Sequence, residues 1–406
     1  MNKRTALRTT TILAIVVLLL AQAAPAIATP PPGKGNSPSQ AKWTFMVYIV
    51  GDNNLDDYVP LDIETELAPA GSNEDVAVVA LADRAATAEW TQTLLFYVTQ
   101  DMEATPENAV EDWGEANMGD PQTLTDFIEW TKTHYPADHY ALSLWNHGWS
   151  WRPDHSMRDD TDGDTLDQHE LEAVLDQVGT VDVIMYDACQ MATIENQATV
   201  RATSRAIVHS QEYYNMDGIE YELIIPALHE DPEMMPEELA VITSLSASTS
   251  AERSTSAVAL NEDWDALIAA VDAWAFALEN GLPEYRQHYV GAFRAAKYFW
   301  QDRTARDLYD VASIIRDRIG VRLDDSEIEA TSQAVMDAVE AVVLDEWHRQ
   351  NLADAHGISI FLPATVADLD DPSTTTWNEF DYYQNYLAFS RLTHWDEFLD
   401  AFINEE

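Results

Sequence analysis

Two apolar segments that each end in a reactive side chain constrain this chain most. Residues 181–189, VDVIMYDAC, end at Cys189, and residues 139–148, HYALSLWNHG, end at His147 and Gly148. Runs of this kind are typical of strands buried on both faces of a sheet. The carboxyl ends of parallel strands meet at one edge of an α/β sheet, where sites form. We therefore predict an α/β fold with a mostly parallel sheet that brings Cys189 and His147 to one edge.

Cys189 has two interpretations. It is the only cysteine in 406 residues, so it forms no intramolecular disulfide and no thiolate cluster for zinc. A neighbouring imidazole makes a thiol a nucleophile at neutral pH, and the helical pattern expected directly after Cys189 would lower the thiol pKa through its dipole. Gly148 adds a backbone N–H for an oxyanion. The alternative is a thiol that fills space in the core, with His147 as a packing or capping residue.

Two aspartates are candidates for recognising a cationic side chain. Asp187 lies two residues before Cys189, on the same side of the strand end, and Asp217 lies in the polar loop after the strand expected at 205–210. A buried pair of carboxylates needs a positive partner to offset its desolvation. The alternative for Asp187 is a structural carboxylate bonded to loop N–H groups.

The amino-terminal segment predicts secretion. Residues 1–28 have a basic start, an apolar core at 12–21 and a small-residue cleavage site at 26–28, which is typical of a signal peptide. Residues 29–41 are rich in Pro, Gly and Ser and predict a flexible linker. A retained membrane anchor is the alternative for the first segment. No later run is long enough to span a bilayer, so we expect no membrane span after signal removal.

The charge excludes two classes of partner. A net charge of −49 repels nucleic acid and anionic membranes and favours basic peptides. Lysine is scarce, and a carboxylate-rich surface stays hydrated in concentrated salt. A high-salt habitat and an ordinary acidic extracellular protein both fit this composition.

Strands and helices alternate through the first part of the chain, and helical periodicity dominates later. We expect a core at about 42–260, a helical region at about 261–355, and a returning strand and terminal helix at 356–406. Strands are expected at 43–50, 76–81, 93–98, 140–145, 257–260 and 357–362, and helices at 55–67, 122–134, 168–177, 236–245, 264–278, 305–319, 328–344 and 395–403.

The loop at 158–167 is dense in carboxylates, which suggests a calcium site. With Gly163 at position six of an EF-hand, position one is Arg158 and position twelve is His169, so that register fails. A looser calcium site at Asp160, Asp162 and Asp164 and a solvent-exposed acidic loop remain as alternatives.

Several motifs in their order and spacing resemble the clostripain family of cysteine peptidases, relatives of caspases, legumains and gingipains. No single motif is specific, but together they extend over nearly all of the chain after the linker. They are Trp43-Thr-Phe-Met-Val-Tyr with Asp52-Asn53-Asn54-Leu55, Trp145-Asn-His147-Gly148, Asp159-Asp160, Tyr186-Asp-Ala-Cys189 with Met191 and Glu195, Ser210-Gln-Glu212 with Asp217-Gly218, Gly357-Ile-Ser-Ile-Phe-Leu-Pro363, and Thr393-His-Trp395 with Phe398-Leu399.

The resemblance implies a caspase-like three-layer sandwich and an endopeptidase with a Cys189–His147 dyad, which the amino-terminal segment predicts to be secreted. It implies an oxyanion hole from the backbone N–H groups of Gly148 and Cys189. Asp187 and Asp217 match the floor of the pocket for the residue before the cut bond, which implies cleavage of peptides and proteins after Arg, or after Lys.

The resemblance also bears on activation and metals. Family members are often zymogens cut in the loop after the histidine. In this loop Arg158 is the basic residue expected to be cut, and Arg152 is the second candidate. The chemistry itself requires no cofactor, and some members need calcium.

One departure concerns the segment after His147-Gly148. The family usually has another glycine there, whereas this chain has Trp149-Ser-Trp151, so the tryptophans would narrow the entrance or contact a substrate side chain. Two other functions stay open: a catalytically silent, calcium-dependent extracellular binding protein on the same fold, and a hydrolase of another amide or ester.

Overall fold

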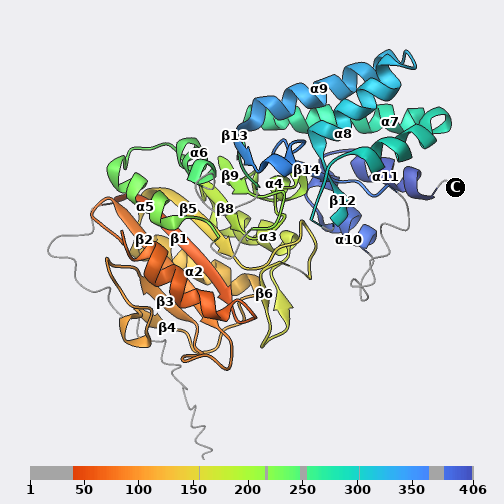
Figure 1. Cartoon of the computed structure of the whole chain (residues 1–406). Helices are drawn as coiled ribbons and strands as arrows, with labels where there is room; N and C mark the ends of the chain where they lie inside the picture. Colours follow the sequence, from red (N-terminus) through yellow and green to blue (C-terminus); the bar gives the residue numbers. More distant parts are fainter. Residues whose placement is uncertain are drawn as a thin grey trace, which may run out of the picture.

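A large mixed sheet forms the centre of this computed structural model, which describes residues 40–154, 156–214, 218–246, 254–300, 302–364 and 379–404 (Figure 1). Within these ranges the sheet has nine strands in the order β13-β10-β9-β8-β5-β1-β2-β3-β4. The inner strands β9, β8, β5, β1 and β2 run parallel, and the outer strands on both sides are antiparallel. The inner strands are β1 (Ala41–Gly51), β2 (Val76–Arg84), β5 (Ala137–Trp145), β8 (Val183–Asp187) and β9 (Ala206–His209), and the outer strands are β3 (Leu94–Tyr97), β4 (Glu111–Asp112), β10 (Ser254–Ala259) and β13 (Val343–His348).

Helices cover both faces of the sheet, because its inner strands are apolar on both sides. Along β1, Phe45 and Val47 face one core, and Met46 and Tyr48 face the other. The first core is covered by the helical segments at 56–67, α5 (Tyr221–Glu230) and α6 (Pro236–Ser246), and the second by α2 (Pro121–His134), α3 (Gln168–Val178) and α4 (Ile194–Val200). The predicted three-layer α/β sandwich is confirmed.

The later part of the chain extends the second core. The long helices α7 (Glu262–Ala295) and α9 (Ser326–Val342) lie side by side, with α8 (Leu308–Ile315) and α11 (Trp395–Asn404) against them (Figure 1). A small sheet connects this region to the centre through β11 (Tyr298–Phe299), β12 (Asp302–Asp307) and β14 (Ser359–Phe361), and α10 (Glu379–Tyr386) follows. The amide of Ser359 donates to the carbonyl of Ala192 at 2.8 Å, which fixes the segment after Cys189.

Several predicted boundaries were wrong. The helix expected at 305–319 begins only at Leu308, because Asp307 ends β12 and caps the helix by accepting from the amide of Asp310 at 2.8 Å. The helix expected at 328–344 ends at Val342, and β13 follows. Ala41, assigned to the linker, is the first residue of β1. The predicted signal and the linker up to residue 39 lie outside the described residues. In the described part of the chain, no helix combines the length and the apolar character needed to cross a membrane.

Candidate active site

The predicted histidine and cysteine follow neighbouring parallel strands. Trp145 at the end of β5 pairs with Asp187 at the end of β8, and the amide of Asn146 donates to the carbonyl of Asp187 at 3.3 Å. A Cβ on Gly148 would lie 2.6 Å from the carbonyl oxygen of Cys189, so the two chain segments touch directly after His147. Only glycine fits at 148. The fold therefore brings the His147 and Cys189 segments together at one edge of the sheet.

Cys189 lies in a turn rather than at the start of a helix. The expected helix directly after it was wrong, because α4 begins only at Ile194. The turn places Gln190 in the left-handed region at φ 57°, and the amide of Gln190 donates to the carbonyl of Glu212 at 3.0 Å. The segment after β9 therefore holds the turn in place. Because α4 starts beyond the turn, its dipole is not placed directly behind the Cys189 thiol.

Asn54 orients the histidine, and sequence reasoning missed this role. The Oδ1 atom of Asn54 lies 2.9 Å from Nε2 of His147, so Nε2 carries the proton and Nδ1 is the basic nitrogen. Desolvation by surrounding atoms lowers the pKa of His147, and the charge of Asp160 opposes this. The imidazole is therefore neutral at pH 7 and able to accept a proton. The signal in the sequence was the polar turn after the first strand.

Two further asparagines hold the turn around His147. The Nδ2 atom of Asn146 donates to the carbonyls of Val50 and Arg158, both at 3.0 Å. The Nδ2 atom of Asn53 donates to the same carbonyls, at 2.9 Å and 3.1 Å. The ends of β1 and β5 and the loop at Arg158 are thereby fixed to one another.

Replacing Asn54 with alanine should lower kcat for peptide hydrolysis by about tenfold to a hundredfold, equal to about 1.4 to 2.7 kcal/mol, with little change in KM. The reason is that the imidazole loses its orienting acceptor. Asn54→Asp should retain orientation but raise the pKa of His147, so the acid limb of the kcat–pH profile should move to higher pH. Steady-state kinetics from pH 5 to pH 9 check both. An unchanged kcat in Asn54→Ala would contradict the role of Asn54 in orienting His147.

Asp187 is buried at the end of β8 and bonded to the loop after β9. Its Oδ1 accepts from the amide of Ile219 at 3.1 Å and its Oδ2 from the hydroxyl of Tyr221 at 2.9 Å. Gly218, at φ +65°, packs so closely that a Cβ there would lie 2.7 Å from Oδ1. Burial raises the pKa of Asp187 to about 6, although these two hydrogen bonds oppose the shift. Its predicted partner Asp217 lies outside the described residues.

The two basic residues predicted as processing positions have opposite environments. Arg158 is exposed in the short strand β6 (Arg158–Asp159) and pairs with Asp160 at 2.8 Å. Arg152 is only 4% exposed and pairs with Asp302 at 2.8 Å and Glu379 at 2.6 Å. A protease reaches Arg152 in this conformation only after local unfolding, so the arrangement favours Arg158.

Replacing Arg152 with alanine should destabilise the protein by about 3 to 5 kcal/mol, because it leaves Asp302 and Glu379 buried without their cation. Arg158→Ala is the matched control and should change stability by less than about 1 kcal/mol, since exposed ion pairs contribute little. Urea unfolding followed by circular dichroism measures both. Equal losses in the two variants would contradict the buried ion pair.

The expectation for the tryptophans of the 149–151 segment was wrong for Trp151. Trp151 is fully buried against the rings of Phe361 and Tyr383, so it cannot narrow an entrance or contact a substrate. Trp149 is half-buried, and its indole N–H donates to Asp302 at 3.1 Å. A cavity of about 650 Å³ is lined by Glu212, Tyr213, Lys297, Tyr298, Trp300 and Asp354 among others. It is linked to the Cys189 turn through Glu212, whose carbonyl accepts from the amide of Gln190.

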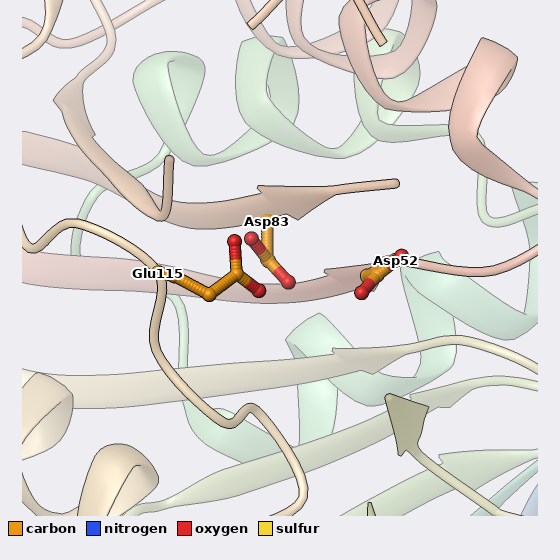
Figure 2. Close-up of side chains that lie close together, drawn as sticks. All are labelled: Asp52, Asp83 and Glu115. Atoms are coloured by element: carbon orange, nitrogen blue, oxygen red, sulfur yellow. The ribbon is translucent and has the colours of Figure 1, made fainter. Parts of the chain in front are cut away.

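The predicted calcium ligands are not brought together. Asp160 pairs with Arg158, and Oδ2 of Asp164 accepts from Asn117 at 2.7 Å. In the described residues a compact carboxylate group forms elsewhere, where oxygens of three acidic residues lie within 4.8 Å of one another (Figure 2). These residues are Asp52, Asp83 and Glu115. Asp52 directly follows β1, and Asp83 lies near the end of β2; both strands were predicted from the sequence.

The chain also matches known proteins in sequence and in fold. The profile of the clostripain family matches residues 47–402. Clostripain of Hathewaya histolytica is 29% identical over 191 residues, which cover 40% of this chain and 36% of that protein. The match thus spans about a third of the relative's length.

Two solved structures share the fold. One is a secreted C11 cysteine protease from Bacteroides thetaiotaomicron bound to an irreversible peptide inhibitor, with a TM-score of 0.64 and 17% identity, and it covers 88% of this chain and 100% of that chain. The other is an inactive zymogen C11 protease from Parabacteroides distasonis, with a TM-score of 0.64, 18% identity and the same coverage. Identities this low establish the fold alone.

Proposed function

This chain belongs to the clostripain family, and on that premise we propose that it is a secreted cysteine endopeptidase that cleaves peptide bonds after arginine. The observation that carries the proposal is the contact between the segments of His147 and Cys189 at neighbouring strand ends, where a Cβ on Gly148 would meet the carbonyl of Cys189 at 2.6 Å. A thiol and a neutral imidazole at such an edge are the two groups that acyl transfer through a thioester requires.

The proposed reaction has two stages. Nδ1 of His147 takes the proton of the Cys189 thiol, and the sulfur attacks the carbonyl carbon of the substrate. The amides of Gly148 and Cys189 stabilise the oxyanion, and within the described residues the Gly148 amide donates no other hydrogen bond. His147 then protonates the leaving amine as the C–N bond breaks. A water molecule, deprotonated by His147, hydrolyses the thioester and regenerates the thiol.

We assign the specificity for arginine to Asp187, with Asp217 as its proposed partner. A pKa of about 6 means that Asp187 is ionised above about pH 6 although it is buried. Burial raises this pKa above the ordinary value of an aspartate, so ionisation of Asp187 in the empty protein is unfavourable. A guanidinium in the pocket would offset this cost, and its planar fork suits a carboxylate better than the ammonium of lysine does.

Cleavage after Arg158 is the proposed activation step. Arg158 is exposed, and its carbonyl is held by Asn53 and Asn146 close to the His147 turn. The chain would thus present its own arginine near the site, as a substrate would. Secretion is proposed from residues 1–28, which have the composition of a signal peptide.

A panel of fluorogenic peptides tests the function. The purified full chain should hydrolyse peptides with Arg before the reporter faster than those with Lys, and should not hydrolyse those with Glu. Prior treatment with iodoacetamide should abolish hydrolysis, because Cys189 is the only thiol. Hydrolysis that survives alkylation would reject the cysteine mechanism. A preference for ester or isopeptide substrates would instead support the other hydrolase function.

A further inference from the structure

The order of the strands indicates on which side of Cys189 each half of a substrate lies. His147 follows β5, Cys189 follows β8, and the loop that begins at Ser210 follows β9, the next strand of the sheet. In the proposed function, on which this step rests, His147 protonates the leaving amine. The residues after the cut bond therefore lie toward β5, and the residues before it lie toward the loop after β9.

The cavity of about 650 Å³ is partly formed by this loop, through Glu212 and Tyr213. Its volume lies within the range of about 300 to 1,000 Å³ that is typical of ligand pockets. The carbonyl of Glu212 accepts from the amide of Gln190 at 3.0 Å. One wall of the cavity is thus hydrogen-bonded to the turn that carries the thiol.

Three aromatic side chains of the described residues line this cavity: Tyr213, Tyr298 and Trp300. Trp300 and Tyr298 are 50% and 39% exposed, and the ring of Tyr213 lies edge-to-face with that of Trp300 at a centroid distance of 4.2 Å. The carboxylate of Glu212 accepts from the amide of Trp300 at 3.2 Å, which connects the two aromatic segments. Exposed rings that gather at a cavity are typical of a binding site.

The charges around the cavity favour an uncharged occupant. Among the described residues that line it, the positive charges of Arg294 and Lys297 are balanced by the negative charges of Glu212 and Asp354. A pocket for a charged group needs an excess of the opposite charge, as the arginine pocket has. The aromatic rings instead offer a large apolar contact surface, which suits an apolar or aromatic side chain.

The cavity and Asp187 lie on opposite faces of the sheet. Asp187 is bonded to Ile219 and Tyr221, which belong to the first core, the one covered by α5 and α6. The cavity is formed by the end of α7 and the segment after it, where Ala296 belongs to the second core. Successive side chains of an extended peptide point to opposite sides. When the substrate arginine points to Asp187, the residue directly before it therefore points toward the cavity.

We propose that this cavity binds the side chain of the residue directly before the arginine and prefers an aromatic or large apolar side chain there. Trp300 and Tyr298 provide the contact surface, and Glu212 positions the segment that carries them. The preferred substrates are then peptides with an aromatic residue followed by arginine, rather than arginyl peptides in general.

Fluorogenic peptides of the form acetyl-X-Arg-reporter, in which only X changes, test this preference in the full chain. The value of kcat/KM with X as Phe should exceed that with X as Ala by about tenfold to a hundredfold, because the cavity removes the ring from water. X as Glu should give no such gain. Equal values for Phe and Ala would overturn the proposal. A larger gain from Phe two residues before the arginine, in acetyl-Phe-Ala-Arg-reporter, would overturn the assigned position.

Variants connect the preference to the cavity. Trp300→Ala should lower the ratio of the Phe to the Ala value at least about fivefold, and Tyr298→Ala should lower it as well. Both side chains are exposed, so the Tm of each variant should stay within a few degrees of the parent. Phe276→Ala is the matched control, because Phe276 is a similarly exposed ring of α7 that stacks on His394 and does not line the cavity. A ratio unchanged in both Trp300→Ala and Tyr298→Ala would overturn the proposal.

Failure of the cavity's role and failure of the proposed function give different results. Hydrolysis of arginyl peptides at a rate independent of X would overturn the role of the cavity and leave the function intact. Absence of hydrolysis of every arginyl peptide would count against the function. Calorimetry with the full chain carrying Cys189→Ala then tests the cavity directly: the Kd for acetyl-Phe-Arg-amide should be at least about tenfold lower than that for acetyl-Ala-Arg-amide. Equal Kd values would overturn the proposal.

Discussion

Replacing Cys189 with alanine should lower kcat/KM for an arginyl amide substrate by on the order of 10⁴- to 10⁶-fold, because it removes the proposed nucleophile. His147→Ala should cause a loss of similar order, since the thiol then has no base to deprotonate it and no acid to protonate the leaving amine. The double variant should be little worse than either single variant, because the two residues act as a unit. Single-turnover and steady-state kinetics with the same fluorogenic peptide measure these losses.

Two controls accompany these variants. His169→Ala changes an exposed histidine of α3 and should retain full activity. The thermal unfolding of Cys189→Ala should remain within a few degrees of the parent, because the Cys189 side chain is small and only half-buried. Hydrolysis in Cys189→Ala at the parental rate would reject the mechanism outright.

If Asp187 holds the substrate guanidinium as proposed, replacing it with asparagine should lower kcat/KM for arginyl substrates by about 10²- to 10³-fold, because the charge is lost. Asparagine has the same shape and still accepts from Ile219 or Tyr221, so the fold should survive. Activity on a substrate with an uncharged residue at that position should change little. Asp182→Asn, at the other end of the same buried segment, is the control and should keep the arginine preference.

The same carboxylate gives the reaction a pH dependence. The pKa of Asp187 is raised to about 6, so the group is protonated and neutral below that pH and charged above it. Arginine preference should therefore fall as the pH drops through about 6, and this limb should be absent in Asp187→Asn. An arginine preference that stays constant from pH 5 to pH 8 in the parent would argue against Asp187 as the charged floor of the pocket.

Much of the sheet could be predicted because its inner strands are buried on both faces. Strands β1, β2, β5 and β8 are continuous apolar runs in the sequence, and their direction follows from the helices between them. β12 and β13 were missed because they are polar, DRTARD and VLDEWH, and adjoin helices whose periodicity masks their ends. The small sheet depends on pairing between distant segments, which no local pattern records.

The candidate site was predictable only in part, for a related reason. His147 and Cys189 each end a recognisable strand, and the order of parallel strands brings such ends together. Asn54 belongs to a turn whose role depends on how β1 lies next to β5. Glu115 lies in a loop with no periodic signal, so its approach to Asp83 follows from the fold alone. The acidic loop at 158–167, by contrast, is dense in carboxylates, but the fold does not bring Asp160, Asp162 and Asp164 together as a metal site.

The central claim is that Cys189 is the nucleophile and His147 its base. The direct test is mass spectrometry of the full chain after reaction with a peptidyl-arginyl chloromethyl ketone. The account predicts one equivalent of label, mapped to Cys189, formed at least about a thousandfold more slowly in His147→Ala and absent with a glutamyl probe. Label on another residue, or equally fast labelling of Cys189 without His147, would contradict it.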